Sequence, residues 1–538
     1  MIKMNKSTLA WKNEWAAIGV ATPAFDYAKM VAKTIAGPTW IHFGAGNIFR
    51  GFIAALQQHI LDSGKAATGI IAADTFDYDI IDRIYQPFDN LSLLVSLRPD
   101  GTTEKKIIAG VAESLKADTA NPDAMRRLRE IFTHPDLQMV SFTITEKGYA
   151  LSDSKGEFFP VVQNDLDAGP GQCRHVMSII TALVYERYRR GKLPLALVSM
   201  DNCSHNGEKL QTALLTIAKA WADNGWVEAD FLAYLQDGKT VSFPWSMIDK
   251  ITPRPSELIA KQLTELGIAG MAPLITAKKT FIAPFVNAEV SQYLVIEDQF
   301  PNGRPPLESA GVYFTDRDTV NKTEKMKVTT CLNPLHTALA IFGCLLGYPS
   351  IAVAIQDPQL QALVEKIGYQ EGMPVVVDPK IIRPMDFIRE VIEERLPNPF
   401  IPDTPQRIAT DTSQKLAIRF GETIKTYLET ERLRVSSLFF IPLVIAGWCR
   451  YLLGVDDKLA PMTLSADPML AELTATLSGV KVGEPETYDG QLQTILANPV
   501  LFGVNLYEAG LGAKVESLFR ELLAGADAVR NTLTKYLS

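Results

Sequence analysis

Hydrophobic positions in the first half of the chain alternate between short continuous runs and helical stripes. Apolar runs that predict buried strands cover residues 39–44, 69–73, 93–97, 106–112, 138–144 and 194–200. Helical stripes, in which apolar residues recur every three to four positions, cover 48–61 and 172–190. Strands that alternate with helices are typical of βαβ units, so we expect an α/β domain built on a mostly parallel sheet.

After about residue 320 the pattern becomes mainly helical. Helical stripes there cover 334–346, 358–368, 385–395, 413–431, 436–453, 468–478 and 513–536. We predict three parts: an N-terminal extension with one amphipathic helix at 1–36, an α/β domain at 37–320, and a mainly α-helical substrate domain at 321–538. Strand-like pieces in 245–320 leave the second boundary open anywhere from about 230 to 325.

Two segments, 337–355 and 438–455, are nearly apolar and are therefore the candidates for membrane-spanning helices. Each contains a proline, Pro349 or Pro442, and the second also carries Arg450. A membrane-spanning helix needs about 20 predominantly apolar residues with few or no charges. We therefore expect two buried core helices, no membrane association and no secretory signal.

Composition excludes several classes of protein. Among the 538 residues, 61 acidic side chains exceed 53 basic ones, which argues against a nucleic-acid partner. The five cysteines contain no C-x-x-C pair, and the six histidines form neither H-x-x-x-H nor H-E-x-x-H. A disulfide framework and a locally spaced zinc site are therefore disfavoured. We expect a cytoplasmic, globular, metal-independent protein.

A glycine turn joins the first predicted strand to the first helix, as Gly44-x-Gly46-x-x-Phe49. In a dinucleotide-binding turn, two such glycines allow the reversal and the close approach of a pyrophosphate to the helix N-terminus, here Asn47 and Ile48. Phe49 occupies the position of the third glycine, so the strict fingerprint is broken. Asp74 ends the next strand, where a carboxylate binds the adenosine ribose and repels a 2′-phosphate, which favours NAD over NADP. An ordinary strand-turn-helix without a ligand is the alternative.

Three later segments concentrate polar residues among apolar ones. They are Ser199–Gly207 at the end of a predicted strand, Glu324–His336, and Asp403–Lys415. Ligands of open α/β sheets bind at such strand ends. Each segment is also compatible with a capped loop or a solvated helix face.

Together these segments resemble the mannitol dehydrogenase family, the polyol-specific long-chain dehydrogenases and reductases. The matching stretches include IHFGAGNIFRGF (41–52), VSFTITEKGYAL (140–151), SMDNCSHNG (199–207), SMIDKITP (246–253), VIEDQFPNGRP (295–305), EKMK…LNPLHTALA (324–340) and DTPQRIATDTSQK (403–415). The resemblance implies a Rossmann-type N-terminal domain, a helical C-terminal domain, NAD as cofactor, no metal, and oxidation or reduction of a polyol, ketose or hexuronate. Within the family, the chain is most similar to the fructuronate reductases.

The resemblance also assigns roles to individual residues. Lys327 matches the catalytic acid–base, Asn202 and Asn333 match the amides that stabilise the oxyanion, and Glu324 would relay protons to Lys327. The expected substrate ligands are His336, Asp249, Arg407 and Lys415. A lysine is a good proton donor near neutral pH only where burial lowers its pKa from about 10.4.

One spacing departs from the family. Members of the family usually place four residues between the lysine and the asparagine, whereas five separate Lys327 from Asn333. Either Lys327 precedes the helix, or the helix carries a one-residue bulge, a feature frequent at functional sites. The neighbouring Lys325 is a weaker alternative for the catalytic position.

The sequence therefore predicts an NAD-dependent reduction of D-fructuronate to D-mannonate. Tagaturonate reduction and mannitol or arabinitol 2-dehydrogenation remain open within the same chemistry. A catalytically inactive relative that binds NAD remains open outside it. We expect a monomer or a weak homo-oligomer whose only partner is a sugar acid or polyol.

Overall fold

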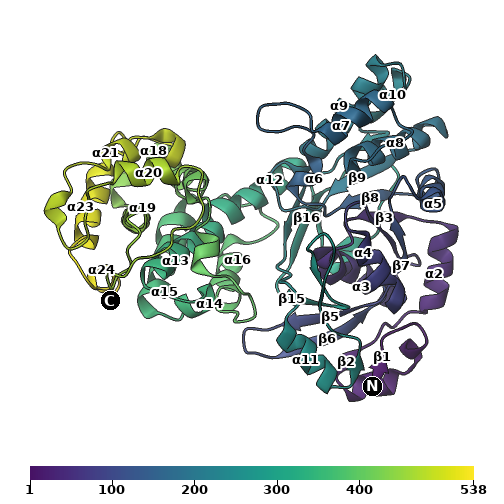
Figure 1. The fold of residues 1–538 in the computed structure, drawn as a ribbon, viewed down its shortest axis with the longest axis horizontal. Coiled ribbons are helices and arrows are strands. Elements are labelled where there is room, and N and C mark those ends of the chain that lie inside the picture. Colours follow the sequence, from purple (N-terminus) through teal and green to yellow (C-terminus); the bar gives the residue numbers. More distant parts are fainter. The chain divides into compact units, whose positions relative to one another are not determined.

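The computed structural model describes residues 1–538 and divides into two compact units. Unit 1 comprises Met1–Leu97 and Thr102–Asn321, and unit 2 comprises Arg98–Gly101 and Lys322–Ser538. Unit 1 carries the strands, and unit 2 is built from helices (Figure 1).

A six-stranded sheet forms the centre of unit 1. All its neighbouring pairs are parallel, in the order β10-β9-β8-β3-β4-β7. The strands are β3 (Trp40–Phe43), β4 (Ile70–Asp74), β7 (Val111–Lys116), β8 (Met139–Phe142), β9 (Leu195–Ser199) and β10 (Val241–Ser242). Numbered along the chain this order is 6-5-4-1-2-3, the order of the dinucleotide-binding fold, and the strand sequence reverses between β3 and β8. The predicted parallel sheet is confirmed.

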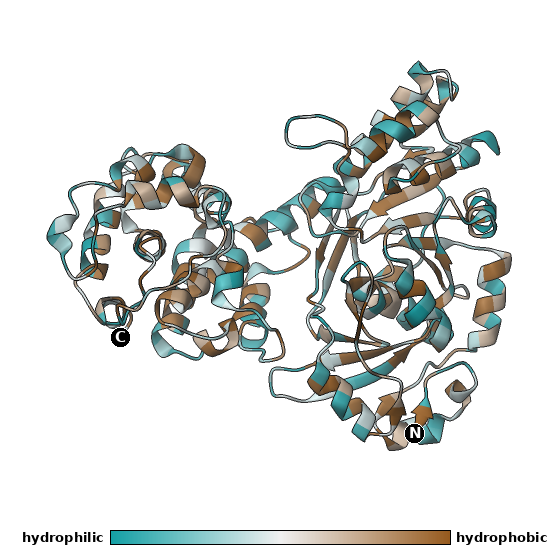
Figure 2. Cartoon of the chain, viewed as in Figure 1, coloured by the Kyte–Doolittle hydropathy of each residue, from teal (hydrophilic) through white to brown (hydrophobic).

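Side chains alternate between the two faces of this sheet and build two hydrophobic cores. Ile41 and Phe43 face a core covered by α5, α7, α8, α9 and α10. Trp40 faces a second core, covered by Phe49, Phe52 and other residues of the helical segment 47–62 that follows β3. Figure 2 shows the hydrophobic colouring along these strands. The helices of unit 1 are α1 (Lys12–Ala17), α2 (Tyr27–Ala36), α3 (Ala54–Asp62), α4 (Tyr78–Ile80), α5 (Pro122–Phe132), α6 (Glu146–Tyr149), α7 (Pro160–Ala168), α8 (Val176–Arg189), α9 (Asn206–Asp223), α10 (Asp230–Gln236) and α11 (Glu257–Glu265).

Smaller sheets complete unit 1. Their orders are β15-β5-β6-β2, β11-β16-β17, β1-β12 and β13-β14. Their strands are β1 (Ile2–Lys3), β2 (Val20–Ala21), β5 (Ser92–Leu97), β6 (Thr103–Ile108), β11 (Ser246–Asp249), β12 (Ile268–Ala269), β13 (Leu274–Ile275), β14 (Phe281–Ile282), β15 (Phe285–Glu289), β16 (Tyr293–Glu297) and β17 (Tyr313–Thr315).

The apolar run 106–112, predicted as one strand, belongs to two strands of different sheets. Its first residues end β6, which pairs antiparallel with β5, and its last residues begin β7, which pairs with β4. Ala109 and Gly110 lie between them, and a side chain at Gly110 would press on the Ala54 carbonyl oxygen at 3.0 Å. Because residues 107–112 on both sides of the turn are buried, hydrophobicity alone did not mark it.

The first 36 residues form two α-helices, a short 3-10 helix and two short strands, and not the single helix expected. β2 pairs with β6 and β1 pairs with β12, so this segment adds edge strands to two sheets of unit 1. Helix α2 begins at the N-cap Asp26, whose carboxylate accepts a hydrogen bond from the Lys29 amide at 3.0 Å.

Unit 2 is helical, as predicted. Its main helices are α12 (Arg317–Met326), which begins in unit 1, α13 (Asn333–Leu345), α14 (Ile351–Ala354), α15 (Pro358–Glu365), α16 (Pro384–Glu390), α17 (Pro405–Ile408), α18 (Glu422–Glu429), α19 (Phe440–Tyr451), α20 (Leu470–Thr476), α21 (Gln493–Leu496), α22 (Pro499–Phe502), α23 (Gly512–Leu522) and α24 (Ala528–Leu537). The stripe 513–536 is two helices, because Gly525 and Asp527 adopt positive φ angles between them. Helix periodicity continued across this turn and did not reveal it.

The continuous helix Arg317–Leu345 is the one helix long and apolar enough, by length and composition, to cross a membrane. Its most apolar stretch is 78% buried, which is the behaviour of a core helix. The second apolar segment forms α19, whose residues from Ile441 to Tyr451 are all buried.

Candidate active site

The glycine turn leaves the carboxyl end of β3, at the point where the strand order reverses. Gly44 has a φ of 101°, and a side chain there would overlap the carbonyl oxygen of Thr143. Gly46 has open space around its Cα, so that a ligand can approach its backbone. Asn47 and Ile48 begin the helix half-buried, and their amides belong to its first turn, which has no intrahelical partners. This geometry fits a bound phosphate group.

Phe49 differs from Asn47 and Ile48 in that its side chain points into the core. Its side chain is fully buried and stacks on His42 with ring centroids 4.2 Å apart. A large side chain at the third fingerprint position therefore packs into the core beneath the turn. The predicted role of Phe49 in cofactor binding is thereby restricted to its backbone.

His42 holds the turn through a buried hydrogen-bond chain, which the sequence did not reveal. Its Nδ1 lies 2.7 Å from Ser141 Oγ, and its Nε2 lies 2.8 Å from Thr143 Oγ1. The Thr143 hydroxyl in turn donates to the Gly44 carbonyl oxygen at 3.1 Å. Burial lowers the pKa of His42 to about 3, so the ring is neutral near pH 7.

We expect acid to destabilise unit 1 through His42. Its folded-state pKa of about 3 lies below the ordinary 6.5, so between these values the unfolded chain binds more protons and stability falls as pH falls. From pH 7 to pH 5 the free energy of unfolding should drop by about 2 kcal/mol on this account. Urea unfolding at both pH values should show that drop in the wild type and not in His42→Gln. His59→Gln, at an exposed histidine, is the control; equal pH dependence in all three proteins would contradict the assignment.

Asp74 closes the same turn from β4. Its carboxylate accepts hydrogen bonds from the amides of Ala45 at 3.1 Å, and of Phe76 and Asp77 at 2.8 Å each. Burial raises the pKa of Asp74, against the effect of these three donors. Asp74 is therefore a structural part of the turn, in addition to its predicted contact with a ribose.

The segment after β9 is organised by Asn206, the first residue of α9. Its side-chain amide donates to the carbonyl oxygens of Asp201 at 3.0 Å and Ser246 at 2.9 Å, and its oxygen accepts from the Ser246 amide at 3.0 Å. These bonds join the end of β9 to the start of β11. Asn202 lies in the exposed turn between β9 and α9, and Asp249 ends β11, buried.

Lys327 begins a π-helical turn, η6 (Lys327–Cys331), inserted between α12 and α13. The Leu332 amide donates to the Lys327 carbonyl oxygen at 3.1 Å, five residues apart, which accommodates one extra residue. This is the second of the two arrangements predicted for the irregular Lys–Asn spacing. Lys327 is 3% exposed, whereas the alternative Lys325 is exposed and pairs with Glu422 at 3.1 Å. Glu324 lies half-buried on α12, one turn before Lys327.

Asn333 and His336 lie one turn apart at the start of α13. His336 Nε2 lies 3.5 Å from Asp403 Oδ2 and is a buried nitrogen without a hydrogen-bond partner. Burial lowers the pKa of His336 to about 4, although the Asp403 charge opposes this effect. The neutral ring can therefore bond a ligand hydroxyl.

Three arginines act electrostatically on His336, and Lys415 in turn lies in the electrostatic environment of two of them, Arg407 and Arg419. Arg407 forms an ion pair with Asp403, and the Lys415 ammonium donates to the Thr410 carbonyl oxygen. Arg419 donates to the hydroxyl of Thr337, which follows His336 in the chain. The charges of Arg419, Arg407 and Arg395 all lower the pKa of His336, which places them in its electrostatic environment. Arg407 and Lys415 were predicted from the sequence. Arg419 and Arg395 were not, because both lie outside the matched motifs.

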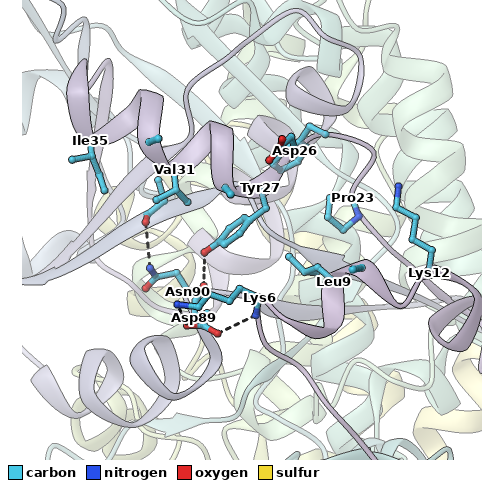
Figure 3. A pocket seen from close by; sticks show the side chains of 15 residues that line it. Lys6, Leu9, Lys12, Pro23, Asp26, Tyr27, Val31, Ile35, Asp89 and Asn90 are labelled. Carbon is cyan, nitrogen blue, oxygen red and sulfur yellow. Dashed lines mark hydrogen bonds and ion pairs between the residues drawn. The ribbon is translucent and has the colours of Figure 1, made fainter.

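A cavity of about 760 Å³ lies elsewhere in unit 1, between the N-terminal segment and the turn at Asp89 and Asn90 (Figure 3). Leu9, Pro23 and Val31 contribute to its apolar wall. Tyr27 crosses it and donates to the Asp89 carbonyl oxygen at 2.6 Å. None of the predicted site residues lines this cavity.

Comparisons with known proteins cover both units. Residues 38–309 match the mannitol dehydrogenase Rossmann domain, and residues 319–522 match the mannitol dehydrogenase C-terminal domain. A D-mannonate oxidoreductase of Thermotoga maritima is 55% identical over 534 residues, which is 99% of this chain and 98% of the relative. Among solved structures, a substrate-free D-sorbitol dehydrogenase has a TM-score of 0.81 at 25% identity, covering 99% of this chain and all of that one. Pseudomonas fluorescens mannitol 2-dehydrogenase, in a ternary complex with NAD and D-mannitol, has a TM-score of 0.70 at 28% identity, covering all of this chain and 99% of that one. The chain belongs to the mannitol dehydrogenase family.

Proposed function

We propose that this chain reduces D-fructuronate to D-mannonate with NADH, and catalyses the reverse oxidation. The observation that carries the proposal is the group of cations beside His336, which suits a sugar that bears a carboxylate. The 55% identity to a D-mannonate oxidoreductase supports it. Tagaturonate reduction and polyol 2-dehydrogenation are the alternatives within the family.

NAD fits the glycine turn. Gly46 leaves room for the pyrophosphate, the first-turn amides of Asn47 and Ile48 would donate to it, and Asp74 would meet the adenosine ribose. The related mannitol 2-dehydrogenase holds NAD in its ternary complex. When bound, NADH supplies the hydride that reduces the keto carbon.

Lys327 is the proposed proton donor in the reductive direction. As the keto carbon is reduced, its oxygen gains negative charge, and the Lys327 ammonium transfers a proton to it. Lys327 is 3% exposed, so little solvent reaches its side chain. Glu324, one turn earlier, would return a proton from solvent to Lys327.

Asn202 and Asn333 are the proposed donors to the developing oxyanion. Their side-chain NH₂ groups add no charge and stay fully donating at any pH near neutrality. Loss of one such donor typically costs about 3–4 kcal/mol of transition-state stabilisation. His336 would bond a substrate hydroxyl through its unpartnered nitrogen, and Asp249 is assigned to the substrate site with it.

We propose that residues 37–320 bind the cofactor and contribute Asn202 and Asp249 to the substrate site, that residues 321–538 supply the other substrate ligands, and that residues 1–36 are an N-terminal extension. We place the reaction in the cytoplasm, where the five free cysteines stay reduced. A monomer or weak homo-oligomer suffices, because each chain contains every proposed residue.

Neutralising the cations should weaken binding of the sugar acid selectively. Arg407→Gln and Lys415→Met should each lower kcat/KM for D-fructuronate about 10–100-fold, because a hydrogen bond to a charged group contributes about 1.5–3 kcal/mol. The loss should appear mainly in KM and be under threefold for D-fructose, which has no carboxylate. Steady-state oxidation of NADH measures both.

Lys535→Met is the matched control, because Lys535 pairs with Glu521 at 2.9 Å on α24 and belongs to no predicted site. It should change neither substrate's KM. Equal losses for fructuronate and fructose in the Arg407 and Lys415 variants would contradict a carboxylate-binding role.

Asp74 should make the enzyme prefer NADH to NADPH. A 2′-phosphate would bring negative charge against a buried carboxylate that already accepts three amide hydrogen bonds. We expect kcat/KM with NADH to exceed that with NADPH by at least about 100-fold, as two unfavourable charges in a partly buried site cost several kcal/mol. A higher kcat/KM with NADPH would contradict this role.

A further inference from the structure

The carboxylate of Asp201 ties the end of β8 to the end of β9. It accepts hydrogen bonds from the amides of Ile144 and Thr145, both at 2.9 Å, and from the Tyr149 hydroxyl at 2.6 Å. Tyr149 is 4% exposed and also lies 2.8 Å from Ser199 Oγ. Asp201 thereby holds residues 144–149, which lie 52 or more positions earlier in the chain.

Thr145 has a strained backbone at this contact. Its φ is 64° and its ψ is 161°, a region that glycine adopts readily and other residues adopt very rarely. A β-branched residue at positive φ is an outlier that persists only where its surroundings enforce it. Here the Asp201 carboxylate accepts the amides of Ile144 and of Thr145 itself, and so holds the peptide that immediately precedes the strained Cα.

The strained segment connects the two parts of the candidate site in unit 1. Thr143, at its start, contacts Gly44 and donates from its hydroxyl to the Gly44 carbonyl oxygen at 3.1 Å. Asp201, at its other end, directly precedes Asn202. Asn206 fixes the same turn from the other side by its bond to the Asp201 carbonyl oxygen. A continuous network therefore runs from the glycine turn to Asn202.

We propose that Asp201 is a positioning residue, which holds Thr145 in its strained conformation and thereby fixes the turn that carries Asn202 beside the end of β8. Asp201 does not touch the substrate in this role and acts through Asn202 and the segment 143–145. The inference rests on the proposed function, because Asn202 is there the oxyanion donor. It goes beyond the predicted site residues, among which Asp201 is absent.

The first test is Asp201→Asn in the full-length enzyme. Its carboxamide has one oxygen, so its NH₂ group faces an amide N–H or the Tyr149 hydroxyl, and at least one of the three bonds is lost. Because a catalytic group displaced by about 1 Å typically costs about 100-fold in rate, we expect kcat with NADH and D-fructuronate to fall about 30–100-fold. KM and the NADH dissociation constant should change less than threefold. Tyr149→Phe removes one donor only and should lower kcat about 3–10-fold.

Relief of the strain is the second test. Thr145→Gly removes the need to enforce the positive φ, so the T145G substitution should raise kcat of the D201N variant at least fivefold. In the wild-type background it should change kcat less than threefold. Asp457→Asn is the matched control, because the Asp457 carboxylate likewise accepts two backbone amides, those of Val529 at 2.8 Å and Arg530 at 3.1 Å, far along the chain from Asn202. It should lower the melting temperature and leave kcat unchanged.

Rescue of kcat by T145G, with little change in KM, supports the proposal. A D201N kcat within threefold of the wild type overturns it. The proposal is also overturned if D201N loses kcat, T145G does not restore it, and the melting temperature of D201N falls as much as that of D457N. If D201N does not fold, a Tyr149→Phe variant with unchanged kcat overturns the proposal. A wild-type protein inactive on every keto sugar acid would refute the proposed function instead, so the two failures are distinguishable.

Discussion

Replacing Lys327 by alanine is expected to lower kcat for reduction of the keto acid about 1,000-fold, within the range of about 10²–10⁴ that general acid–base catalysis contributes. The amine is buried at the start of the π-helical turn, and the variant offers no other proton donor at that position. NADH binding, measured by fluorescence titration, should stay within threefold of the wild type, because the glycine turn belongs to unit 1.

Lys325→Ala is the matched control for this prediction. Lys325 lies two residues earlier, is exposed and pairs with Glu422 at 3.1 Å, so its removal should change kcat less than twofold. A Lys327→Ala variant that keeps more than a tenth of the wild-type kcat would contradict the catalytic assignment. A large loss in Lys325→Ala alone would transfer the role to that lysine.

Gly44→Ala should cost both stability and cofactor binding. The new methyl group would overlap the Thr143 carbonyl oxygen, and the φ of 101° is unfavourable for alanine. Strain of about 1–2 kcal/mol and overpacking of about 1–3 kcal/mol together predict a loss of roughly 2–5 kcal/mol in the free energy of unfolding. The NADH dissociation constant should rise at least about 100-fold, since the turn that presents the helix N-terminus is displaced.

Two other glycines separate these effects. Gly64 also has a positive φ, but a side chain there would meet no other atom. Gly64→Ala should therefore lower the free energy of unfolding by about 1 kcal/mol and leave NADH binding unchanged. Gly46→Ala meets open space, so it should preserve stability and weaken NADH binding if the pyrophosphate approaches there. A Gly44→Ala variant with wild-type stability and NADH affinity would contradict the geometry of the turn.

Much of the fold was predictable because its cores are organised by local periodicity. The buried strands β3, β4, β8 and β9 are short apolar runs, and the helices of unit 2 carry clear stripes. The predictions failed where periodicity continued through a turn, at Ala109–Gly110 and near Gly525. At Ala109–Gly110 no polar residue marks the turn, because residues 107–112 are all buried. Near Gly525 the apolar stripe resumes directly after Asp527, so the periodicity concealed the break.

Some features of the candidate site could also be predicted from the sequence, and others could not. The helix bulge after Lys327 was foreseen as one of two explanations for the Lys–Asn spacing, because an extra residue in a helix must be accommodated somewhere. His42, Asp201 and Arg419 could not be assigned from the sequence. Their roles arise from contacts with residues 52 to 101 positions away, or from charges on other helices, and no local pattern encodes such contacts.

The most direct test of the central claim is NADH oxidation by the purified protein with D-fructuronate, D-tagaturonate and D-fructose side by side. We predict the highest kcat/KM for D-fructuronate, at least about tenfold above the other two, because the cations beside His336 and the proton donor Lys327 are matched to a keto-sugar acid. Robust turnover of fructose with none on either uronate would contradict it.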